Sequence, residues 1–343
     1  MQAVILSAGK STRTYPLTIT KPKPLLKVAN KPIIIHTLES LVGIVDEVII
    51  IVGYKKENII SYLGDTFKAM KIKYVTQKSQ TGTGSALACA KDFLSNKFLV
   101  MMGDDIYSKK DILKCTKYPY AVVGCKVKEP SNFGVYVIGN GFVKDLIEKP
   151  KRFVSEIANT GLYLLDRKIF GLLGEIKKSE RNEYELTSAI RLLANEQEVR
   201  CITTTKWYPI GYPWDLLRVD RILRNKKNSI GENTKINGSV INSSIGDNCF
   251  IEGKILNSII MDNTIIKDSF IEDSVIGSNV NFQGTIISKR GIIKNVNGKD
   301  IKVEKLGAVI GDNVKASNAN VTNGAMIWPD KTICNCVIDK DVY

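Results

Sequence analysis

Short apolar runs recur along the first part of the chain. They are too short for helices, and most are rich in β-branched residues. This pattern is typical of buried strands. The predicted strands are residues 3–6, 45–52, 72–75, 98–102 and 121–127. Residues 32–42 and 55–63 lie between them and have the apolar spacing of amphipathic helices. Alternating strands and helices predict a mostly parallel sheet with helices on both faces, and such sheets bind ligands beyond the carboxyl ends of their strands.

The last third of the chain has a different pattern, with many Ile, Asn, Ser, Gly and Asp residues and few helix formers. One short phrase recurs there, with its copies at residues 230–233, 245–248, 276–279 and 310–313. Aliphatic residues return at steps of about six, as from Ile245 to Ile251. Such a repeat predicts a parallel β-helix in which each hexad forms one face of a triangular coil and isoleucine points inward.

The change in pattern divides the chain into two predicted domains, residues 1–225 and residues 226–343. We expect the basic segment 218–229 to be the linker and residues 288–305, where the repeat is irregular, to loop out of the β-helix. A chain of 343 residues is long enough for two domains with cores of their own.

Composition limits the possible environments and partners. No apolar run approaches the length of a membrane span, and the first residues lack a secretory layout. Seven scattered cysteines, an odd number without paired spacing, favour a reducing compartment, so we expect a cytoplasmic protein. The net charge of +14 suits anionic ligands. Because the lysines are spread along the chain, we expect no nucleic acid and no membrane as partner.

The most informative stretch directly follows the first predicted strand. Ser7-Ala8-Gly9 is followed by Lys10, Ser11, Thr12 and Arg13, and Lys21 and Lys23 then stand among three prolines. A strand that ends in a glycine turn with hydroxyls and cations forms an anion-binding concavity, and proline makes such a loop semi-rigid. This predicts a polyphosphate site. A P-loop is disfavoured because it requires glycine where Val4 stands, and a cationic surface loop is the simpler alternative.

The same stretch resembles the signature of the sugar-1-phosphate nucleotidyltransferases, Leu-Ala-Ala-Gly-x-Gly-Thr-Arg-x-x-Pro-Leu-Thr-x-x-x-Pro-Lys-Pro. Here it runs from Leu6 through Arg13 and Thr18 to Pro22-Lys23-Pro24, with Ser11 in place of the second glycine. The resemblance implies a Rossmann-like α/β nucleotidyltransferase domain with a mixed, mostly parallel sheet. By further resemblance, the hexads imply that a left-handed parallel β-helix follows it.

The resemblance also implies which residues bind the nucleotide. They are Leu6, Ala8, Gly9, Lys10, Ser11, Thr12, Gln77, Gly82, Thr83 and Asp104. Gln77 would pair with a pyrimidine base, since an amide offers the donor and acceptor that the imide face of uracil or thymine needs. A polar turn that caps a helix is the alternative interpretation of residues 77–86.

A metal site is expected where residues 98–102 end in Gly103-Asp104-Asp105. A carboxylate at the end of a strand is suited to Mg²⁺. Asp104 matches the aspartate that holds the metal in the family, and Asp105 is a weaker candidate. The family's second metal contact is an aspartate in Trp-x-Asp-x-Gly-x-Pro, where this chain has Pro209. Asp215, six residues later, is a conceivable substitute.

Three further segments resemble the sugar-phosphate site of the family. The implied contacts are Gly134, Glu148, Lys149, Asn159 and Thr160. Glu148 and Asn159 would hold the sugar, and Lys149 would hold its phosphate. Ser188 is another departure, because the family has aspartate at that position of its Glu-Leu-Thr-Asp motif.

The resulting hypothesis is transfer of a nucleoside monophosphate from UTP or dTTP to a sugar 1-phosphate, with Arg13 and Lys23 as catalytic residues and Mg²⁺ as cofactor. The departures Ser11, Ser188 and Pro209 leave a second hypothesis, a catalytically weakened paralogue that binds nucleotide or sugar nucleotide and regulates or scaffolds an active partner subunit. An acyltransferase role of the β-helix is less favoured, because no histidine base follows His36. We expect a homo-oligomer, such as a trimer through the β-helix, or a hetero-oligomer with a paralogue.

Overall fold

The computed structural model describes residues 1–343, which form two compact units. The first unit comprises Met1–Gly9 and Ile34–Pro209, and the second comprises Lys10–Ile33 and Ile210–Tyr343. The segment Lys10–Ile33 therefore packs with the C-terminal part of the chain although it directly follows the first strand. The predicted domain boundary between residues 225 and 226 is a different division of the chain from these two units, and it stays a prediction.

The first unit is built on a ten-stranded mixed sheet with the order β10-β11-β13-β9-β12-β7-β1-β4-β6-β5. Its strands are β1 (Gln2–Ser7), β4 (Glu47–Val52), β5 (Thr66–Phe67), β6 (Met70–Thr76), β7 (Lys97–Met102), β9 (Tyr120–Lys126), β10 (Gly134–Gly139), β11 (Phe142–Glu148), β12 (Ile157–Asp166) and β13 (Val199–Thr204). Strand β1 lies in the centre, parallel to β4 and β7. The runs in β1, β4, β7 and β9 are almost fully buried, whereas β6 contains both buried and exposed residues. A strand is present at each predicted position, which confirms the predicted strands.

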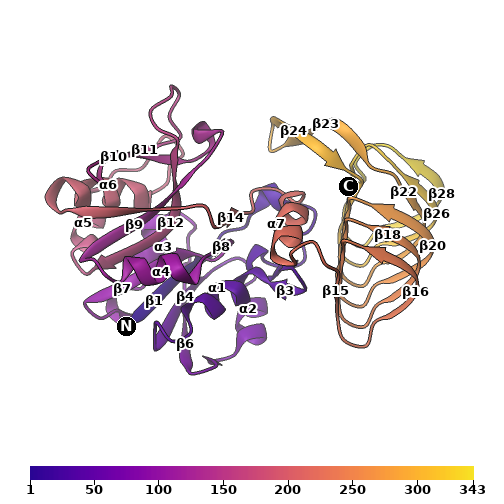
Figure 1. The fold of residues 1–343 in the computed structure, drawn as a ribbon, viewed down its shortest axis with the longest axis horizontal. Helices are drawn as coiled ribbons and strands as arrows, with labels where there is room; N and C mark the ends of the chain where they lie inside the picture. The colour runs from indigo at the N-terminus through magenta and orange to yellow at the C-terminus, as the bar shows by residue number, and fades with distance from the viewer. The chain divides into compact units, whose positions relative to one another are not determined.

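Helices cover this sheet because each presents an apolar stripe. They are α1 (Ile33–Leu41), α2 (Lys56–Leu63), α3 (Thr83–Ala88), α4 (Lys109–Cys115), α5 (Ile169–Glu175) and α6 (Leu186–Glu196). Helices α3, α5 and α6 pack against one another, and Leu87, Leu172 and Ile190 join the same core as Phe98 of β7. Helix α4 contacts β9, β12 and β13 (Figure 1). Helix α3 ends at Ala88, and the chain then forms a 3-10 turn at residues 91–93.

The C-terminal part of the second unit is the predicted left-handed parallel β-helix, whose stacked coils are visible in Figure 1. One six-stranded ladder consists of β15 (Ser229–Ile230), β17 (Ser244–Ile245), β19 (Ile259–Ile260), β21 (Val275–Ile276), β25 (Ala308–Ile310) and β27 (Ala325–Ile327). The other consists of β16 (Lys235–Ile241), β18 (Phe250–Leu256), β20 (Ile265–Glu272), β22 (Asn281–Ile286), β26 (Lys315–Val321) and β28 (Thr332–Ile338). Inward isoleucines such as Ile245, Ile260, Ile276 and Ile310 are fully buried.

The asparagine of each repeated phrase turns a corner of the coil. Asn233, Asn248, Asn263, Asn279 and Asn313 all have left-handed φ values between 55° and 62°, a conformation that asparagine tolerates better than most residues. Their side chains also form a ladder, since Asn233 donates to Asn248 at 3.3 Å and Asn248 donates to Asn263 at 3.2 Å. Successive corners are 15 residues apart in the first coils, so a coil is shorter than three full hexads.

Two irregular segments differ in outcome. The predicted loop-out at residues 288–305 is confirmed as an antiparallel hairpin of β23 (Lys289–Val296) and β24 (Lys299–Leu306). The predicted linker 218–229 is wrong over its first half, because helix α7 (Asp215–Leu223) continues to Leu223 and buries Leu216 and Val219. No helix of the structure has the length and hydropathy that crossing a membrane requires.

Candidate active site

The carboxyl ends of β1 and β7 meet at the centre of the sheet, as expected for adjacent parallel strands. The backbone N–H of Gly103 donates to the carbonyl of Leu6 at 2.9 Å. A side chain at Gly103 could not be accommodated, because its Cβ would lie 1.9 Å from the Ser7 hydroxyl. This close approach fixes Asp104, the next residue, at the sheet edge where Ala8 and Gly9 leave β1. Four predicted site residues, Leu6, Ala8, Gly9 and Asp104, thus share one edge.

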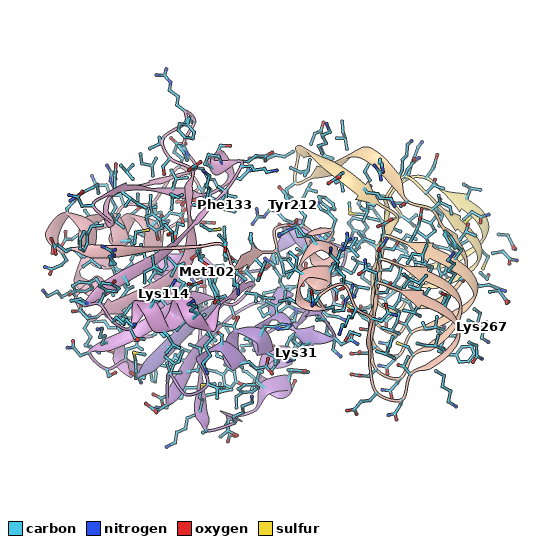
Figure 2. All side chains as sticks on the ribbon, viewed as in Figure 1. Lys31, Met102, Lys114, Phe133, Tyr212 and Lys267 are labelled. Atoms are coloured by element: carbon cyan, nitrogen blue, oxygen red, sulfur yellow. The ribbon has the colours of Figure 1, made fainter.

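The Asp105 carboxylate forms a hydrogen bond within the fold. It begins β8 (Asp105–Tyr107), which pairs with β14 (Trp207–Pro209) so that Asp105 lies opposite Pro209. The Trp207 indole N–H donates to the Asp105 carboxylate at 2.9 Å. The ring of Trp207 in turn contacts Phe133 edge to face, at 5.4 Å between centroids. Phe133 is labelled in Figure 2.

Asp104 suits a divalent cation that takes its other ligands from a substrate. Nowhere do three or more His, Cys, Asp or Glu side chains converge in a way that could hold a metal ion by themselves. Mg²⁺ is commonly bound by one or two carboxylates together with phosphate oxygens and water, so a single carboxylate fits. Asp215 lies in the second unit, where its Oδ2 accepts the N–H groups of Gly211 and Tyr212 at 2.7 and 2.8 Å.

The segment predicted to recognise the base is ordered by its own hydrogen bonds. Gln77 is only 6% exposed, and its amide donates to the Ser85 hydroxyl at 2.8 Å and to the Gly82 carbonyl at 3.2 Å. Gly82 has φ 111°, and a Cβ there would lie 2.5 Å from the Tyr184 carbonyl. The backbone of Tyr184 therefore approaches Gly82 closely, and no side chain fits between them. The Thr83 hydroxyl accepts the N–H of Leu186 at the start of α6, at 3.0 Å.

Gly134 and Glu148 are in register at the start of β10 and the end of β11. A Cβ on Gly134 would lie 2.8 Å from a Glu148 carboxylate oxygen, so the absence of a side chain there gives the carboxylate its place. Burial raises the pKa of Glu148, although the nearby Arg181 opposes this rise. Arg181 lies 3.4 Å from Glu148 and 2.7 Å from Glu185. Arg181 could not be deduced from the motifs, because it belongs to none of them and the sequence shows only a charged residue in a loop.

Lys149 directly follows Glu148 and has a left-handed φ of 45°. Its backbone N–H donates to the Phe133 carbonyl at 3.0 Å, which ties the chain after β11 to the residue before β10. The predicted sugar-phosphate residues Gly134, Glu148 and Lys149 therefore lie at one end of one hairpin.

Asn159 and Thr160 lie on β12, at an irregularity in its pairing with β9. The Asn159 side-chain oxygen accepts the Tyr136 hydroxyl at 2.7 Å, and its amide donates to the Tyr163 hydroxyl at 2.7 Å. One of its two N–H donors is thus used within the protein. Thr160 is 1% exposed and donates to the Val123 carbonyl at 2.9 Å, so its side chain supports the sheet.

The second unit contains the cationic part of the signature, and its turn depends on Ser11. This residue has φ 51° and ψ 50°, a left-handed conformation, which explains why glycine is suited to this position. The Ser11 carbonyl accepts the Thr14 N–H at 3.1 Å and the hydroxyls of Thr14 and Thr18 at 2.7 and 2.9 Å. Ser11 thus departs from the family signature in its side chain but adopts the conformation that the signature requires.

The predicted catalytic cations of this segment differ in exposure. Lys10 and Arg13 are exposed, whereas Lys23 is 4% exposed in the 3-10 turn Lys23–Leu25. The Arg13 guanidinium lies over the ring of Tyr212, 5.8 Å from its centroid. Tyr212 was not predicted from the sequence. The only indication of its role there is its aromatic side chain close to Trp214. The ring limits the orientations of Arg13 without removing its charge.

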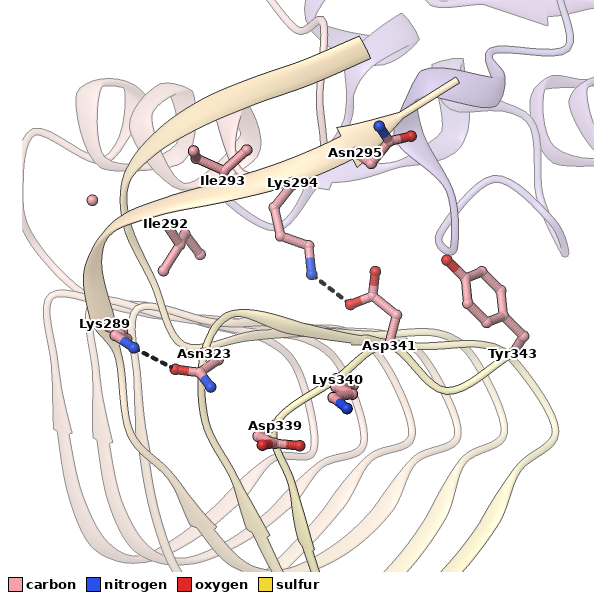
Figure 3. A pocket seen from close by; sticks show the side chains of 11 residues that line it. Lys289, Ile292, Ile293, Lys294, Asn295, Asn323, Asp339, Lys340, Asp341 and Tyr343 are labelled. Atoms are coloured by element: carbon pink, nitrogen blue, oxygen red, sulfur yellow. Dashed lines mark hydrogen bonds and ion pairs between the residues drawn. The ribbon is translucent and has the colours of Figure 1, made fainter. Parts of the chain in front are cut away.

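Two surface cavities are lined by none of the predicted site residues. One of about 640 Å³ lies in the second unit between the β23–β24 hairpin and residues 339–343, where Lys294 pairs with Asp341 at 2.5 Å (Figure 3). The other, of about 480 Å³, lies in the first unit between α4 and the end of β13. Both therefore lie apart from the motifs that point to chemistry.

Comparison with known proteins agrees with these motifs. Residues 2–226 match the family model of the nucleotidyl transferases. The chain is 38% identical to a protein of Methanocaldococcus jannaschii named bifunctional protein GlmU, and the alignment covers 100% of this chain and 96% of that protein. It is 34% identical to the UTP–glucose-1-phosphate uridylyltransferase AglF of Haloferax volcanii, over 68% of this chain and 100% of that protein.

Solved structures give the same result for the fold. A putative glucose-1-phosphate thymidylyltransferase from Bacillus anthracis, solved in complex with sucrose, superimposes with a TM-score of 0.60 at 29% identity. The superposition covers 66% of this chain and 96% of that one. A UDP-glucose pyrophosphorylase complexed with UDP-glucose gives a TM-score of 0.61 at 25% identity and covers 66% of this chain and 99% of that one.

Proposed function

The chain belongs to the nucleotidyl transferase family, and from this premise we propose that it transfers a nucleoside monophosphate from UTP or dTTP to a sugar 1-phosphate. The observation that carries the proposal is the junction of β1 and β7. There the Gly103 N–H bonds to the Leu6 carbonyl and sets Asp104 at the sheet edge where Ala8 and Gly9 leave β1. The family match over residues 2–226 supports the same assignment.

The reaction needs no protein nucleophile. A phosphate oxygen of the sugar 1-phosphate attacks the α-phosphorus of the nucleotide, and the bond from that phosphorus to the bridging oxygen of pyrophosphate breaks. Positioning and charge neutralisation provide most of the catalysis in such transfers. We assign Arg13 to the β- and γ-phosphates and to the leaving pyrophosphate, and Lys23 to the α-phosphate. Backbone from Leu6 to Thr12 lines the nucleotide site, with Lys10 as a further phosphate contact.

The two substrates are recognised by the motifs of the first unit. Gln77, with Gly82 and Thr83 beside it, contacts the pyrimidine base. The Glu148 carboxylate accepts hydrogen bonds from sugar hydroxyls, and the Asn159 amide forms further hydrogen bonds with the sugar. The backbone of Gly134 and Thr160 borders the sugar, and Lys149 neutralises its phosphate. The half-buried carboxylate of Glu148 fits a neutral polyol, because a sugar hydroxyl can donate to it without bringing a second charge.

Members of this family work with a divalent metal, and we propose Mg²⁺ held by Asp104 together with substrate phosphate oxygens. Bound there, the cation supplies positive charge to the phosphates during transfer. Pro209 offers no oxygen ligand from its side chain, so the affinity for metal rests on Asp104 and on the nucleotide.

The test is an assay of the purified full-length chain with Mg²⁺, UTP or dTTP and a panel of sugar 1-phosphates. Release of pyrophosphate with at least one pair supports the proposal. Nucleotide binding without pyrophosphate from any pair would instead favour the weakened paralogue. Native mass spectrometry of the same sample tests our further proposal that the β-helix mediates assembly, as a homotrimer or with a paralogous subunit.

A further inference from the structure

The repeated phrase of the β-helix places carboxylates at one position of several coils, so that they form a column along one edge. Its third position is Asp247 in the copy at 245–248 and Asp312 in the copy at 310–313, and Asp262 occupies the same place after Ile260. Ser278 stands at this position in the copy at 276–279. Each of the three aspartates uses Oδ1 to accept a backbone N–H of the neighbouring coil. The coil itself therefore accounts for one carboxylate oxygen, and the contacts of the other oxygen call for a separate explanation.

Within the second unit, Asp312 binds the cationic signature segment directly. Its Oδ2 accepts the Thr20 hydroxyl at 2.6 Å and lies 3.0 Å from the Lys21 ammonium. Lys21 also donates to the Ser278 hydroxyl at 2.9 Å. The other oxygen, Oδ1, accepts the backbone N–H of Ser278 at 2.8 Å, which fixes the carboxylate. The Asp312 side chain is 7% exposed and that of Lys21 is 19% exposed, so the pair is well shielded from water.

Two more members of the column bind Lys27. Its ammonium lies 2.8 Å from Asp262 and 3.1 Å from Asp247. Burial disfavours the charge of Lys27, but the two carboxylates outweigh burial and raise its pKa. Asp247 and Asp262 each accept a backbone N–H of the neighbouring coil, from Glu232 and Asp247 respectively, both at 2.9 Å. The coil thus orients the carboxylates before they meet the lysine.

The hairpin of the β-helix makes another contact with the same segment. The Asn297 amide, between β23 and β24, donates to the Thr12 hydroxyl at 2.9 Å. Thr12 adjoins Arg13, while Lys21 and Lys27 stand on either side of the 3-10 turn that carries Lys23. The β-helix therefore holds the segment next to one proposed catalytic cation and on both sides of the other.

We propose that the β-helix is a positioning device for nucleotidyl transfer, in which Asp312, Asp262 and Asp247 fix the segment Thr20–Lys27 and thereby the location of Lys23. This inference rests on the proposed function of the same site. Positioning of a charged group contributes to catalysis because a displacement of about 1 Å can cost on the order of a hundredfold in rate. Asp312 is a positioning residue, since it acts through Lys21 and Thr20 and not on substrate.

The test compares full-length Asp312→Asn with wild type and with Asp330→Asn. The asparagine keeps an acceptor for the Ser278 N–H. It replaces Oδ2, which accepts the Thr20 hydroxyl and pairs with Lys21, with an uncharged amide N–H₂ group. Asp330 is exposed in the adjoining coil, and its carboxylate accepts a hydrogen bond from Asn313 at 2.9 Å, so it is a matched control. We expect Asp312→Asn to lower kcat/KM for the nucleotide about tenfold, equivalent to about 1.4 kcal/mol, with KM for the sugar 1-phosphate unchanged. Asp330→Asn should match wild type in both.

Amide hydrogen exchange gives a readout that needs no turnover. In Asp312→Asn, exchange should become about tenfold faster in residues 10–33 and stay unchanged in the coils at 244–286. The double variant Lys21→Met with Asp312→Asn should be no worse than either single variant, because removing both partners leaves no buried charge unpaired.

These readouts separate the two proposals. A wild-type chain that binds UTP but releases no pyrophosphate contradicts nucleotidyl transfer. Positioning is then still supported if Asp312→Asn weakens UTP binding and speeds exchange at 10–33. Positioning is overturned if Asp312→Asn has wild-type nucleotide kinetics and affinity together with wild-type exchange in that segment. It is overturned equally if the loss extends to the coils, which would mean general destabilisation.

Discussion

Pro209 lies directly opposite Asp105 where β14 pairs with β8, at the position where the family signature has a metal-binding aspartate. Substituting Pro209→Asp adds the missing oxygen ligand near Asp104. We expect the Mg²⁺ concentration for half-maximal pyrophosphate release to fall about tenfold, since an added carboxylate strengthens a hard-cation site. Pro209→Ala is the control for loss of the proline ring. An unchanged Mg²⁺ titration in Pro209→Asp would show that this position does not contribute to metal binding.

Ser11 offers a test of whether its departure from glycine matters. Because its φ is 51°, a β-branched residue there is strained, and Ser11→Val should lower the free energy of unfolding by about 1–2 kcal/mol. Ser11→Gly should stay within about 0.5 kcal/mol of wild type, because relief of strain is offset by a more flexible unfolded chain. Urea denaturation measures both, with pyrophosphate release as a check on the turn. Equal stability of the valine and glycine variants would contradict a conformational role for residue 11.

The sequence predicted most reliably those features that depend on local pattern. The run from Val48 to Val52 is buried on both faces, and this follows from its uninterrupted apolar character. Helix α7 was missed because Arg218, Arg221 and Arg224 made residues 218–229 look like a charged linker. Its buried stripe, which includes Leu216 and Val219, is short and is interrupted by these cations.

The candidate site shows the same limit. Motif spacing identified Asp104 and Glu148, whose neighbours in the fold are set by strand register. It could not identify the pairing of Lys21 with Asp312, because the two residues are far apart in the chain and either could have paired with water or another charge. Nor could it show that Thr83 and Thr160 use their hydroxyls within the protein, at Leu186 and Val123.

Lys23 should have a large effect on catalysis. Lys23→Met approximately keeps the length of the buried side chain and removes the charge. We expect the loss in kcat/KM to correspond to about 3 kcal/mol of transition-state stabilisation, as for loss of one transition-state contact. The control is Lys226→Met, a change at an exposed lysine of the same unit. Circular dichroism and urea denaturation establish that both variants fold. Wild-type kcat/KM in a folded Lys23→Met protein would remove Lys23 from the catalytic assignment.

Glu148 should make sugar binding sensitive to pH. Its pKa is raised above 4.5 by burial, so it becomes protonated at a higher pH than an ordinary glutamate. KM for the sugar 1-phosphate should therefore rise on acidification from neutral pH, beginning above pH 4.5. Glu148→Gln should raise this KM about tenfold at neutral pH and flatten the profile. If the acidic rise in KM persists in Glu148→Gln, another group is responsible.

The same residue gives a linked prediction for stability. Because the folded protein binds the proton of Glu148 more tightly than the unfolded chain does, the residue disfavours folding as pH rises from the unfolded pKa through the folded one. Glu148→Gln should thus increase the free energy of unfolding at neutral pH and have little effect near pH 4.5 or below. Urea denaturation at the two pH values measures the difference. A stability gain that is the same at both would contradict this origin.

Among the charged residues of the second unit, we expect Asp220 to contribute most to stability. Its carboxylate lies 2.7 Å from the Arg224 guanidinium, with side chains only 2% and 3% exposed. It also accepts the Ala29 N–H at 2.7 Å and the Ser244 hydroxyl at 2.6 Å, so it joins the signature segment, α7 and the first coils. Asp220→Ala leaves Arg224 buried and unpaired, which should cost about 3–5 kcal/mol in urea denaturation. Asp339→Ala, at an exposed carboxylate, should change stability by no more than about 0.5 kcal/mol. A similarly small loss of unfolding free energy in Asp220→Ala would mean that water replaces the carboxylate. The contacts of Asp220 would then contribute little to stability.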